Sequence, residues 1–492
     1  MPMPHDEIWI VEGIFNSIAL MHHGIYAVSA MSCSNYPHLL LSSIIDQAEA
    51  AERKRPKLVW AFDDGKAGTS YAKKFKERSE KDGWVSSCAI IRGRGGRYPD
   101  WNDQHQADRL QPGDIEEYRY YGSLICARSA ADKSRLMYQR KKWSMFYFDY
   151  DNRLFWFEYD AVKYNAEFNK ISQEKEGSGI SEDQIRDLAL EASRSIKEIA
   201  NCKPTALYYQ ANALTDESWY YVRIDFPHDG QAVKNTFTGS QLSSSSEFKK
   251  RLLSMAPGAL YTGSALHLDL WMQKQMFGIK TVQTIDFIGY SSAHEAWVFD
   301  DIAVKAGRVH ELNQEDFFDI GKLAIKSLNQ SVALSINPEL KDYDPEWTKL
   351  VWQCFGPKGI VALAFWLGSL FAEQIRAQQE SFPFIEIVGE PNSGKSTLIE
   401  FMWKLCGRTA YEGFDPQKAT IAARARNFAQ VANLPIVLIE SDRDGGEGDK
   451  IKQKSFDWDE LTTAFNGRSV RSTGVKNGGN DTRKPPFRGA IV

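Results

Sequence analysis

Apolar runs alternate with amphipathic stretches over residues 7–110. Runs of consecutive apolar residues, typical of buried strands, occupy 7–13, 25–30, 57–65 and 84–93. Apolar positions at helical spacing occupy 14–24, 39–55 and 67–83. Strands that alternate with helices in this way usually join into one sheet through crossover connections. The pattern therefore predicts a parallel α/β sheet in this part of the chain.

The pattern changes after this region. An aromatic-rich stretch at 143–160 predicts a hairpin, and a charged stretch at 163–200 predicts a helix. Strand-like runs follow at 205–225 and 281–305, which indicates an α+β arrangement. The polar stretches expected to form surface turns are 177–183 and 240–248.

The last part of the chain is expected to be a second α/β region. A helical pattern covers 335–380, and strand patterns follow at 383–388 and 434–439. With 492 residues, several domains are expected. The fold class predicted is a multidomain α/β protein. Its three domains are an N-terminal parallel-sheet domain at 1–115, an α+β middle domain at 116–330, and a nucleotide-binding domain at 331–492.

Composition and charge exclude some classes of protein. Hydrophobic residues make up 43% and charged residues 25%, which is ordinary for a soluble globular protein. A net charge of −4 excludes a protein that coats nucleic acid by its overall charge, although a local basic groove remains allowed. The six cysteines contain no C-x-x-C pair, so we expect buried, reduced thiols rather than disulfides or a zinc ribbon.

No segment indicates export or membrane insertion. The opening residues MPMPHDEIWIVEG have no basic start before their short apolar run. The longest apolar stretch, 359–372, is too short to span a bilayer comfortably and is predicted to be a buried helix. We therefore expect a cytoplasmic protein with no membrane partner.

The stretch GEPNSGKST at 389–397 matches G-x-x-x-x-G-K-[ST], the loop that surrounds the phosphates of a nucleoside triphosphate. Gly389 and Gly394 let the backbone curl, Lys395 would reach the β- and γ-phosphates, and Ser396 would hold Mg²⁺. The remaining residues of the predicted ATP site are Glu390, Pro391, Asn392, Ser393 and Thr397.

Such a site also needs a carboxylate at the end of a neighbouring strand, to serve Mg²⁺ and the attacking water. Glu440 and Asp442 follow the apolar run 434–439 and are the candidates. Ser441 separates them, so which of the two acids holds the metal stays open. A solvated strand end is the alternative interpretation.

Basic residues gather near the end of the chain among glycines and polar residues. They are Arg468, Arg471, Lys476, Arg483 and Lys484. A flexible basic loop in an ATPase is suited to gripping the phosphate backbone of single-stranded DNA. The alternative is a solvated turn.

Carboxylates follow several of the N-terminal strand patterns. They are Glu12, Asp63, Asp64, Asp100 and Asp103. The ends of parallel strands meet at one edge of a sheet, so these acids are expected to converge. Converging carboxylates repel one another unless a hard cation such as Mg²⁺ lies between them. Carboxylates with Mg²⁺ are the apparatus for phosphoryl chemistry on nucleic acids.

The phosphate loop and the basic segment together resemble the superfamily 3-type helicase ATPases of phages and mobile elements, which have a P-loop core of the AAA+/RecA-like kind. The resemblance implies a homo-oligomeric ring that draws single-stranded DNA through its pore, with Lys476 as the candidate pore residue. The residues RGAIV at 488–492 look like the start of the strand that carries the family's sensor residue. The resemblance therefore predicts a domain truncated at its C-terminal end.

The N-terminal acids resemble the motifs of the Toprim domain of bacterial-type primases, topoisomerases and related nucleases. The matching segments are VEGIFNSIAL at 11–20, FDDGKAG at 62–68 and DWND at 100–103. By this resemblance Glu12 would be the acid/base residue and a metal ligand, and Asp63 and Asp100 would be metal ligands. Gly65 stands where the family has its second aspartate, so Asp64 is the substitute ligand. Asn16 replaces a frequent aspartate.

Two parts expected of a primase are not found in the sequence: a zinc-binding domain, and a basic template-binding domain before the Toprim motif. Either the chain is truncated there, or these tasks belong to another protein. Two further features keep two interpretations each, and a third has one. The basic run 92–99 would hold a nucleic-acid phosphate or be a solvated loop, and the aromatics at 143–159 would stack bases or, more often, form core. His22 and His23 are expected to be ordinary helix-end histidines.

The main hypothesis is a DNA primase-helicase-like replication protein of a phage or mobile element. Lys395, Ser396 and Glu440 would hydrolyse ATP to drive translocation on single-stranded DNA, and other replication proteins would be partners. The first alternative is an ATP-regulated Toprim nuclease. The second is an ATPase with a catalytically inactive Toprim domain that docks a partner, since Gly65 departs from the family pattern.

Overall fold

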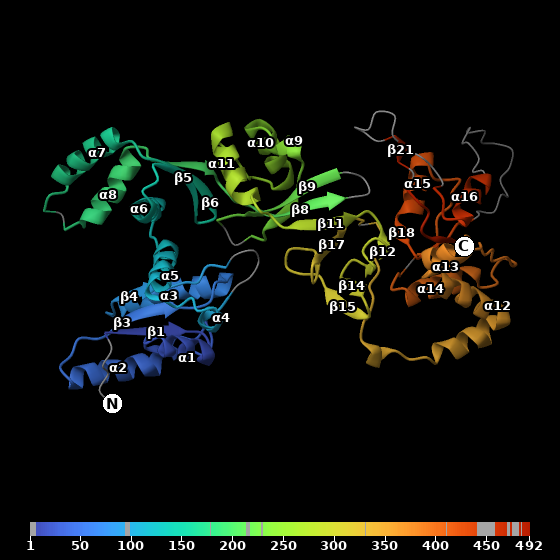
Figure 1. The fold of residues 1–492 in the computed structure, drawn as a ribbon, viewed down its shortest axis with the longest axis horizontal. Helices are drawn as coiled ribbons and strands as arrows, with labels where there is room; N and C mark the ends of the chain where they lie inside the picture. Colours follow the sequence, from blue (N-terminus) through green and yellow to red (C-terminus); the bar gives the residue numbers. More distant parts are fainter. Residues whose placement is uncertain are drawn as a thin grey trace. The chain divides into compact units, whose positions relative to one another are not determined.

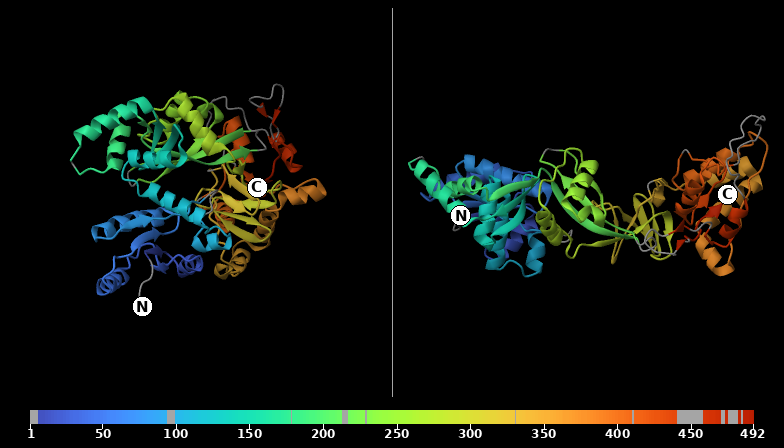
Figure 2. Two further views of the ribbon diagram at one scale, coloured as in Figure 1. Left: turned by 60° about the vertical axis from the view of Figure 1, so that its left-hand side comes forward. Right: turned by 90° about the horizontal axis from the view of Figure 1, so that it is seen from above.

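The structure is a computed structural model (Figure 1, Figure 2). It describes residues 6–93, 99–177, 179–212, 217–227, 230–329, 331–409, 411–439, 458–469, 473–474, 482–483 and 485–492. The chain falls into two compact units, which are described separately. The first comprises Met1–Thr205, Val222–Asn235 and Ser240–Gly278. The second comprises Ala206–Tyr221, Thr236–Gly239 and Ile279–Val492.

The first unit begins with a four-stranded parallel sheet in the order β2-β1-β3-β4. Its strands are β1 (Glu7–Val11), β2 (Ala27–Ser29), β3 (Lys57–Ala61) and β4 (Ser86–Cys88). The helices around them are α1 (Ile14–His22), α2 (His38–Ala50), α3 (Lys66–Lys81), α4 (Trp101–Gln106) and α5 (Pro112–Ile125). Val11 lies opposite both Ser29 and Ala61, so the neighbouring strands end at one level. The predicted parallel sheet is confirmed.

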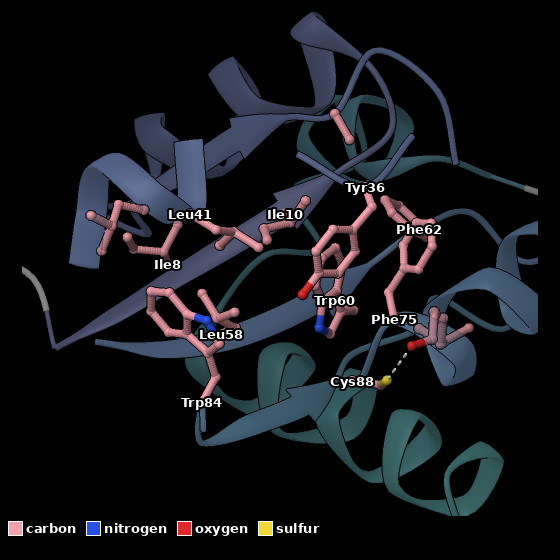
Figure 3. Close-up of a cluster of buried hydrophobic side chains, with 14 residues drawn as sticks. Ile8, Ile10, Tyr36, Leu41, Leu58, Trp60, Phe62, Phe75, Trp84 and Cys88 are labelled. Atoms are coloured by element: carbon pink, nitrogen blue, oxygen red, sulfur yellow. Dashed lines mark hydrogen bonds between the residues drawn. The ribbon is translucent and has the colours of Figure 1, made fainter. Parts of the chain in front are cut away.

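Helices cover both faces of this sheet. On one face, Ile8, Ile10, Leu58 and Trp60 pack against side chains of α2 and α3, as Figure 3 shows for Leu41 and Phe75. On the other face, the alternate strand residues pack with Leu20 of α1, Trp101 of α4 and Tyr118 of α5. Strands buried on both faces need apolar residues at every position, which explains why they stand out in the sequence as continuous apolar runs.

The aromatic stretch forms the predicted hairpin. Strands β5 (Met145–Tyr150), β6 (Arg153–Glu158) and β7 (Ile196–Ala200) make an antiparallel sheet in that order. Phe146, Phe148 and Phe157 are buried in one cluster, so the core interpretation is correct for them. Trp143, which precedes the hairpin, is 53% exposed.

The other helices of the first unit are α6 (Ala130–Lys141), α7 (Ala161–Glu174), α8 (Glu182–Ala192), α9 (Gly239–Leu242), α10 (Ser245–Met255) and α11 (Ala265–Met276). The single helix predicted over 163–200 is wrong, because α7 and α8 are separate. Gly177 adopts a positive φ after α7, and the Ser181 side chain caps the start of α8. The turn predicted over 240–248 is also partly wrong, because Ser244 caps α10.

Two larger sheets are formed by later parts of the chain. A six-stranded sheet has the order β10-β9-β8-β11-β17-β16. Its strands are β8 (Lys203–Asn212), β9 (Glu217–Asp225), β10 (Val233–Phe237), β11 (Thr281–Ile285), β16 (Phe318–Ile320) and β17 (Leu323–Ser327). The five-stranded sheet consists of β15 (Arg308–Glu311), β14 (Ile302–Lys305), β13 (Ala296–Val298), β12 (Ile288–Ser291) and β18 (Val431–Ala432). The predicted strand regions 205–225 and 281–305 are confirmed as sets of shorter strands.

The remaining elements of the second unit surround the phosphate-loop sequence. The helices are α12 (Trp347–Ser369), α13 (Ala372–Gln379), α14 (Lys395–Leu405), α15 (Ile421–Ala429) and α16 (Thr462–Phe465), with 3₁₀ turns at Leu340–Asp342 and Trp458–Leu461. The short strands are β19 (Pro435–Ile436), β20 (Thr473–Gly474), β21 (Thr482–Arg483) and β22 (Ala490–Ile491). The strand pairs β19–β22, parallel, and β20–β21, antiparallel, are each two residues long.

The strand predicted at 383–388 is wrong, because the structure assigns no strand there. The Ile385 N–H donates a hydrogen bond to the Ile491 carbonyl at 3.2 Å, so the segment runs beside β22. Val388 remains 79% exposed.

Helix α12 is long and apolar enough to cross a membrane by length and composition alone. Gly356 adopts a positive φ of 57° and Pro357 follows it, so the helix is kinked there. Ala362 and Trp366 are buried, whereas Val361 and Leu367 are about 60% exposed. The predicted buried helix is therefore correct for one face only.

The six cysteines are free thiols, as predicted. Cys88 and Cys202 are buried, Cys354 is exposed, and Cys33, Cys126 and Cys406 are intermediate. The expectation that they are buried is therefore correct for two of them and wrong for Cys354, which lies on the exposed side of α12.

Candidate functional site

The acids of the N-terminal domain lie at the carboxyl edge of its parallel sheet. Glu12 directly follows β1, Asp63 and Asp64 come shortly after β3, and Asp100 is the N-cap of α4. Because β1 and β3 are neighbours in register, Glu12 and Asp63 leave the sheet side by side. The sheet topology therefore brings these acids together from three separate parts of the sequence.

Asp63 is the centre of this acidic group. Burial raises the pKa of its carboxyl to about 6, and the charges of Glu12, Asp100 and Asp103 act in the same direction. The four carboxyls are thus close enough to repel one another. Such a group gains stability when it binds a cation or a proton.

Asn16 holds Asp63 in place. Its side-chain amide donates to Asp63 Oδ1 at 3.4 Å, and its side-chain oxygen accepts from the Asn102 backbone N–H at 3.2 Å. Asn16 is only 4% exposed and lies on the buried face of α1. It therefore joins β3 to the start of α4. In the sequence, Asn16 stands out only as a departure from a motif. The signal for its role is an amide on the apolar face of a helix.

Asp100 and Asp103 are fixed by the start of α4. Asp100 Oδ1 accepts from the Asp103 backbone N–H at 2.8 Å, and Asp103 Oδ2 accepts from the Asp100 backbone N–H at 3.1 Å. This reciprocal pair is a capping box. One oxygen of each carboxylate is used by the helix, and the other oxygen is left for a ligand.

Asp64 has a different partner from the other acids. Its Oδ2 accepts from the Gly93 backbone N–H at 2.7 Å, which ties the end of β3 to the segment after β4. The charge of Asp64 does not contribute to the raised pKa of Asp63. Its predicted role as a metal ligand in place of the missing aspartate at Gly65 stays a prediction.

Cys33 is a neighbour that the sequence did not indicate. Burial raises the pKa of its thiol, and the charges of Glu12 and Asp63 raise it as well. The side chain therefore lies beside the acidic group and stays protonated. Cys33 belongs to no motif, so only the fold could place it there.

The residues of the acidic group fit Mg²⁺ in donor chemistry. Hard carboxylate oxygens are the ligands that this ion prefers, and it keeps several waters while binding one or two carboxylates. Among the described residues, no three His, Cys, Asp or Glu side chains are placed to hold one ion together. The arrangement is therefore suited to an ion held by a pair of carboxylates with water, and not to a closed protein cage.

The phosphate-loop sequence forms a turn followed by a helix. Gly394 has a left-handed φ of 86° and is the N-cap of α14, which begins at Lys395. Lys395 Nζ donates to the backbone oxygens of Gly389 at 2.6 Å and Glu390 at 2.9 Å. The Lys395 ammonium therefore lies within the loop at the helix N-terminus, where an anion is favoured.

Other predicted residues of the ATPase are only partly described. Glu440, Asp442, Arg471, Lys476 and Lys484 lie outside the described residues, so the structure says nothing of their positions. Arg468 is exposed shortly after α16. Strands β20 and β21 pair as an antiparallel ladder, and Lys476 falls between them in the sequence.

His22 and His23 lie at the end of α1, as expected. His105 of α4 contacts both, with ring centroids 5.1 Å away from each, and His23 Nε2 is 2.9 Å from His105 Nδ1. The contact joins the C-terminal ends of α1 and α4. No pattern along the chain groups His105 with the other two histidines.

Comparison with known proteins gives one family match, over residues 9–105, to a family described as Toprim-like. This segment contains β1 to β4 and the acids around Asp63. Residues 9–105 are Toprim-like. The match does not extend to the phosphate-loop sequence. Toprim domains typically bind Mg²⁺, in agreement with the donor set at this edge of the sheet.

No curated protein matches the chain. Among solved structures, the RNA polymerase domain of Mycobacterium tuberculosis primase DnaG is similar at 20% identity and a TM-score of 0.20. The similarity covers 28% of this chain and 43% of that chain. The match thus spans less than half of the DnaG domain.

Proposed function

We propose that this chain is a primase-helicase-like replication protein of phage or mobile-element type. In this proposal, the Toprim-like domain carries out Mg²⁺-dependent nucleotidyl or phosphodiester chemistry. The C-terminal region hydrolyses ATP to move along single-stranded DNA. The observation that carries the proposal is the group of carboxyls around Asp63, at the carboxyl edge of a parallel sheet, in a segment that matches a Toprim-like family.

In the Toprim-like site, Asp63 and Asp100 would hold Mg²⁺, which when bound would neutralise charge on the reacting phosphate. Asn16 would keep the Asp63 carboxylate turned toward this edge. The α4 capping box would do the same for Asp100. Glu12 is only partly buried and no described side chain is bonded to its carboxylate. This carboxylate is therefore the group proposed to accept the proton of the attacking hydroxyl.

In the ATPase region, Lys395 would leave the Gly389 and Glu390 carbonyls to contact the β- and γ-phosphates, while Ser396 would hold Mg²⁺. Glu440 or Asp442 would hold the metal and orient water. Arg468, Arg471 and Lys476 would contact the DNA backbone inside a homo-oligomeric ring. The proposal places the protein in the cytoplasm, with other replication proteins as partners.

The test uses the full chain and two assays. ATP hydrolysis is measured with and without single-stranded DNA, and primer synthesis is measured on a single-stranded template with nucleotides and Mg²⁺. We expect ATP turnover to rise with DNA, and Glu12→Gln to abolish primer synthesis while sparing ATP turnover. ATP turnover that does not respond to DNA would contradict the motor. Mg²⁺-dependent nicking of plasmid DNA by the protein, in the absence of nucleotides, would favour a nuclease over a primase.

A second candidate is a Toprim-like domain that docks a partner without chemistry. It is favoured by the Asp64 carboxylate, which is bound to the Gly93 N–H, and by Gly65 at the position of the missing aspartate. Mn²⁺ titration separates the two candidates. Binding that is lost in Asp63→Ala supports the catalytic site, and no binding in either protein supports docking.

A further inference from the structure

Three lysines and one arginine from different parts of the first unit lie in the region of one carboxylate. The Arg92 guanidinium lies over the ring of Tyr121, 5.8 Å from its centroid, and its charge acts on the carboxylate from there. Arg92 lies just after β4, Lys133 is on α6, Lys203 begins β8 and Lys274 is in the last turn of α11. Asp149, on β5, lies among them. These four cations are called the basic cluster below. Only Arg92 belongs to the basic run that the sequence singled out.

The contacts of the cluster are specific. Lys203 Nζ lies 3.0 Å from Asp149 Oδ2. Lys133 Nζ donates to the Asp149 backbone oxygen at 2.5 Å and lies 3.8 Å from Asp149 Oδ2. Lys274 Nζ lies over the ring of Tyr147, 4.7 Å from its centroid. Helix α11 packs on β5 (Figure 1), and both Tyr147 and Asp149 belong to that strand.

The charges of the cluster do not balance, because it contains four cations and one carboxylate. Burial acts to raise the pKa of Asp149, but Lys133, Lys203 and Arg92 overcome it and hold this pKa well below its usual range. Burial lowers the pKa of Lys133, Asp149 opposes this, and Lys203 and Arg92 lower it further. Burial and Arg92 likewise lower the pKa of Lys274. The cations therefore repel one another around a single anion.

A purely structural role does not account for this excess. One lysine is enough to pair with Asp149 and to tie β5 to its neighbours. Within the described part of the chain, neither Arg92 nor Lys274 forms an ion pair, and both are exposed. The cluster thus presents unneutralised positive charge to solvent, which favours a multiply charged anion.

The cluster adjoins the acidic edge of the sheet through the backbone. Arg92 directly precedes Gly93, whose N–H is bound by Asp64. The backbone bond from Gly93 to Asp64 is the observation that links the two groups. An acidic group that holds a metal repels the other phosphates of a nucleic acid or polyphosphate, and nearby cations offset that repulsion.

We propose that the basic cluster binds the phosphates next to the reacting one, either in the backbone of a single nucleic-acid strand or in the polyphosphate of a nucleotide. The inference rests on the proposed function in that the substrate is taken to be a nucleic acid or nucleotide. Recognition is by charge, so it is independent of base sequence.

The first test is lysine footprinting of the full chain. An amine-reactive acetylating reagent is applied to three samples in a buffer that contains EDTA. One sample has no ligand, one has an oligo-dT 20-mer and one has ATP. Acetylation of each lysine is quantified by mass spectrometry. We expect at least a threefold loss of labelling at Lys274 and Lys203. Lys249 on α10 and Lys170 on α7, both exposed, are the controls and are expected to label equally in all samples. Equal labelling of Lys274 and Lys203 in all samples would overturn the proposal.

The second test measures affinity for the labelled 20-mer against salt by fluorescence anisotropy. For a single strand, each phosphate contact contributes about 0.7 to the slope of log affinity against log salt concentration. Lys274→Ala should therefore reduce the slope by about 0.7. The double variant Arg92→Ala/Lys274→Ala should reduce it by about 1.4. Lys249→Ala is the matched control. An unchanged slope and affinity in the double variant, with no protection by ATP, would contradict the proposal.

The samples with the 20-mer and with ATP distinguish the two sources of phosphate. Protection by the 20-mer alone assigns the cluster to the nucleic-acid strand, and protection by ATP assigns it to a nucleotide polyphosphate. Because both tests are run in EDTA, a Toprim-like site without catalytic activity does not alter their outcome. Failure of this inference can therefore be told from failure of the proposed chemistry.

Discussion

At the scale of single residues, the acidic edge is organised around Asp63. Its carboxyl is partly buried, and nearby carboxyls raise its pKa further. No described cation acts to lower this pKa. In a metal-free protein this residue is therefore a source of instability. The same arrangement gives a cation a favourable position, because binding removes the repulsion.

Replacing Asp63 by asparagine should stabilise the metal-free protein at pH 7. The pKa of Asp63 in the folded protein, about 6, lies above its unfolded value, so the cost of its charge is fully present above pH 6 and disappears as the pH falls toward 4. After allowance for solvent screening, Asp63→Asn should gain about 1–2 kcal/mol at pH 7. Urea unfolding in EDTA at pH 7 and pH 5 measures this, and the gain should shrink at pH 5.

Asp46→Asn, at an exposed position on α2, is the control for removal of one negative charge. It should change stability little at either pH. Mg²⁺ should raise the melting temperature of the wild type and of Asp46→Asn, but not of Asp63→Asn. Equal stabilisation of all three proteins by Mg²⁺ would remove Asp63 from the metal site.

Asn16 is a positioning residue for Asp63, and its removal should weaken metal binding. Partners that orient a ligand typically contribute about 10–100-fold to metal affinity. We expect Asn16→Ala to weaken Mn²⁺ affinity by about 10-fold, measured by electron paramagnetic resonance of free Mn²⁺. Ser17→Ala, next to it on α1, removes a hydrogen bond to the Ile14 carbonyl only, and should leave Mn²⁺ affinity unchanged.

At the scale of elements, the entry of α3 fixes the backbone at Asp63. A Cβ on Gly68 would lie 2.2 Å from the Asp63 carbonyl oxygen, so no side chain fits between this helix and the end of β3. The glycine of the FDDGKAG segment is therefore required by close packing. It allows the helix to start immediately after the acids.

Gly68→Ala should destabilise the protein by about 1–3 kcal/mol, since overpacking forces α3 away from Asp63. Gly113→Ala is the matched control: it lies in α5, and a Cβ added there would meet no atom within 4 Å. That change should be neutral or stabilising, because alanine favours a helix. Equal unfolding free energies for the two variants would show that α3 has room to adjust.

Sequence patterns predicted the strands of the N-terminal sheet and failed for the segment 383–388. The buried strands β1 and β3 have neighbours on both sides and appear as apolar runs. The segment 383–388 has a similar pattern, but the structure assigns no strand there. An apolar pattern alone does not reveal whether a neighbouring strand forms a ladder with the segment.

At the scale of the whole molecule, the acidic edge and the phosphate loop belong to different compact units. Each can therefore be inactivated without direct damage to the other.

Lys395→Ala should lower ATP turnover at least 100-fold, because the cation for the β- and γ-phosphates is lost. Its hydrogen bonds are to loop carbonyls only, so the melting temperature should change little. Mn²⁺ binding at the acidic edge should remain at the wild-type value. ATP turnover is measured as the rate of phosphate release. Undiminished turnover in the variant would mean that the loop does not hold the nucleotide.

The sequence by itself determined the parallel N-terminal sheet, the acids at its edge and the turn and helix of the phosphate loop. These features depend on local order: buried strands need apolar runs, and a glycine-rich turn needs glycine at fixed positions. Only the tertiary structure decided which polar groups meet. The Asn16 bridge, the Asp64 bond to Gly93, Cys33 beside the acids and the basic cluster around Asp149 all join residues distant in sequence, and a pattern along the chain does not record such distances in space.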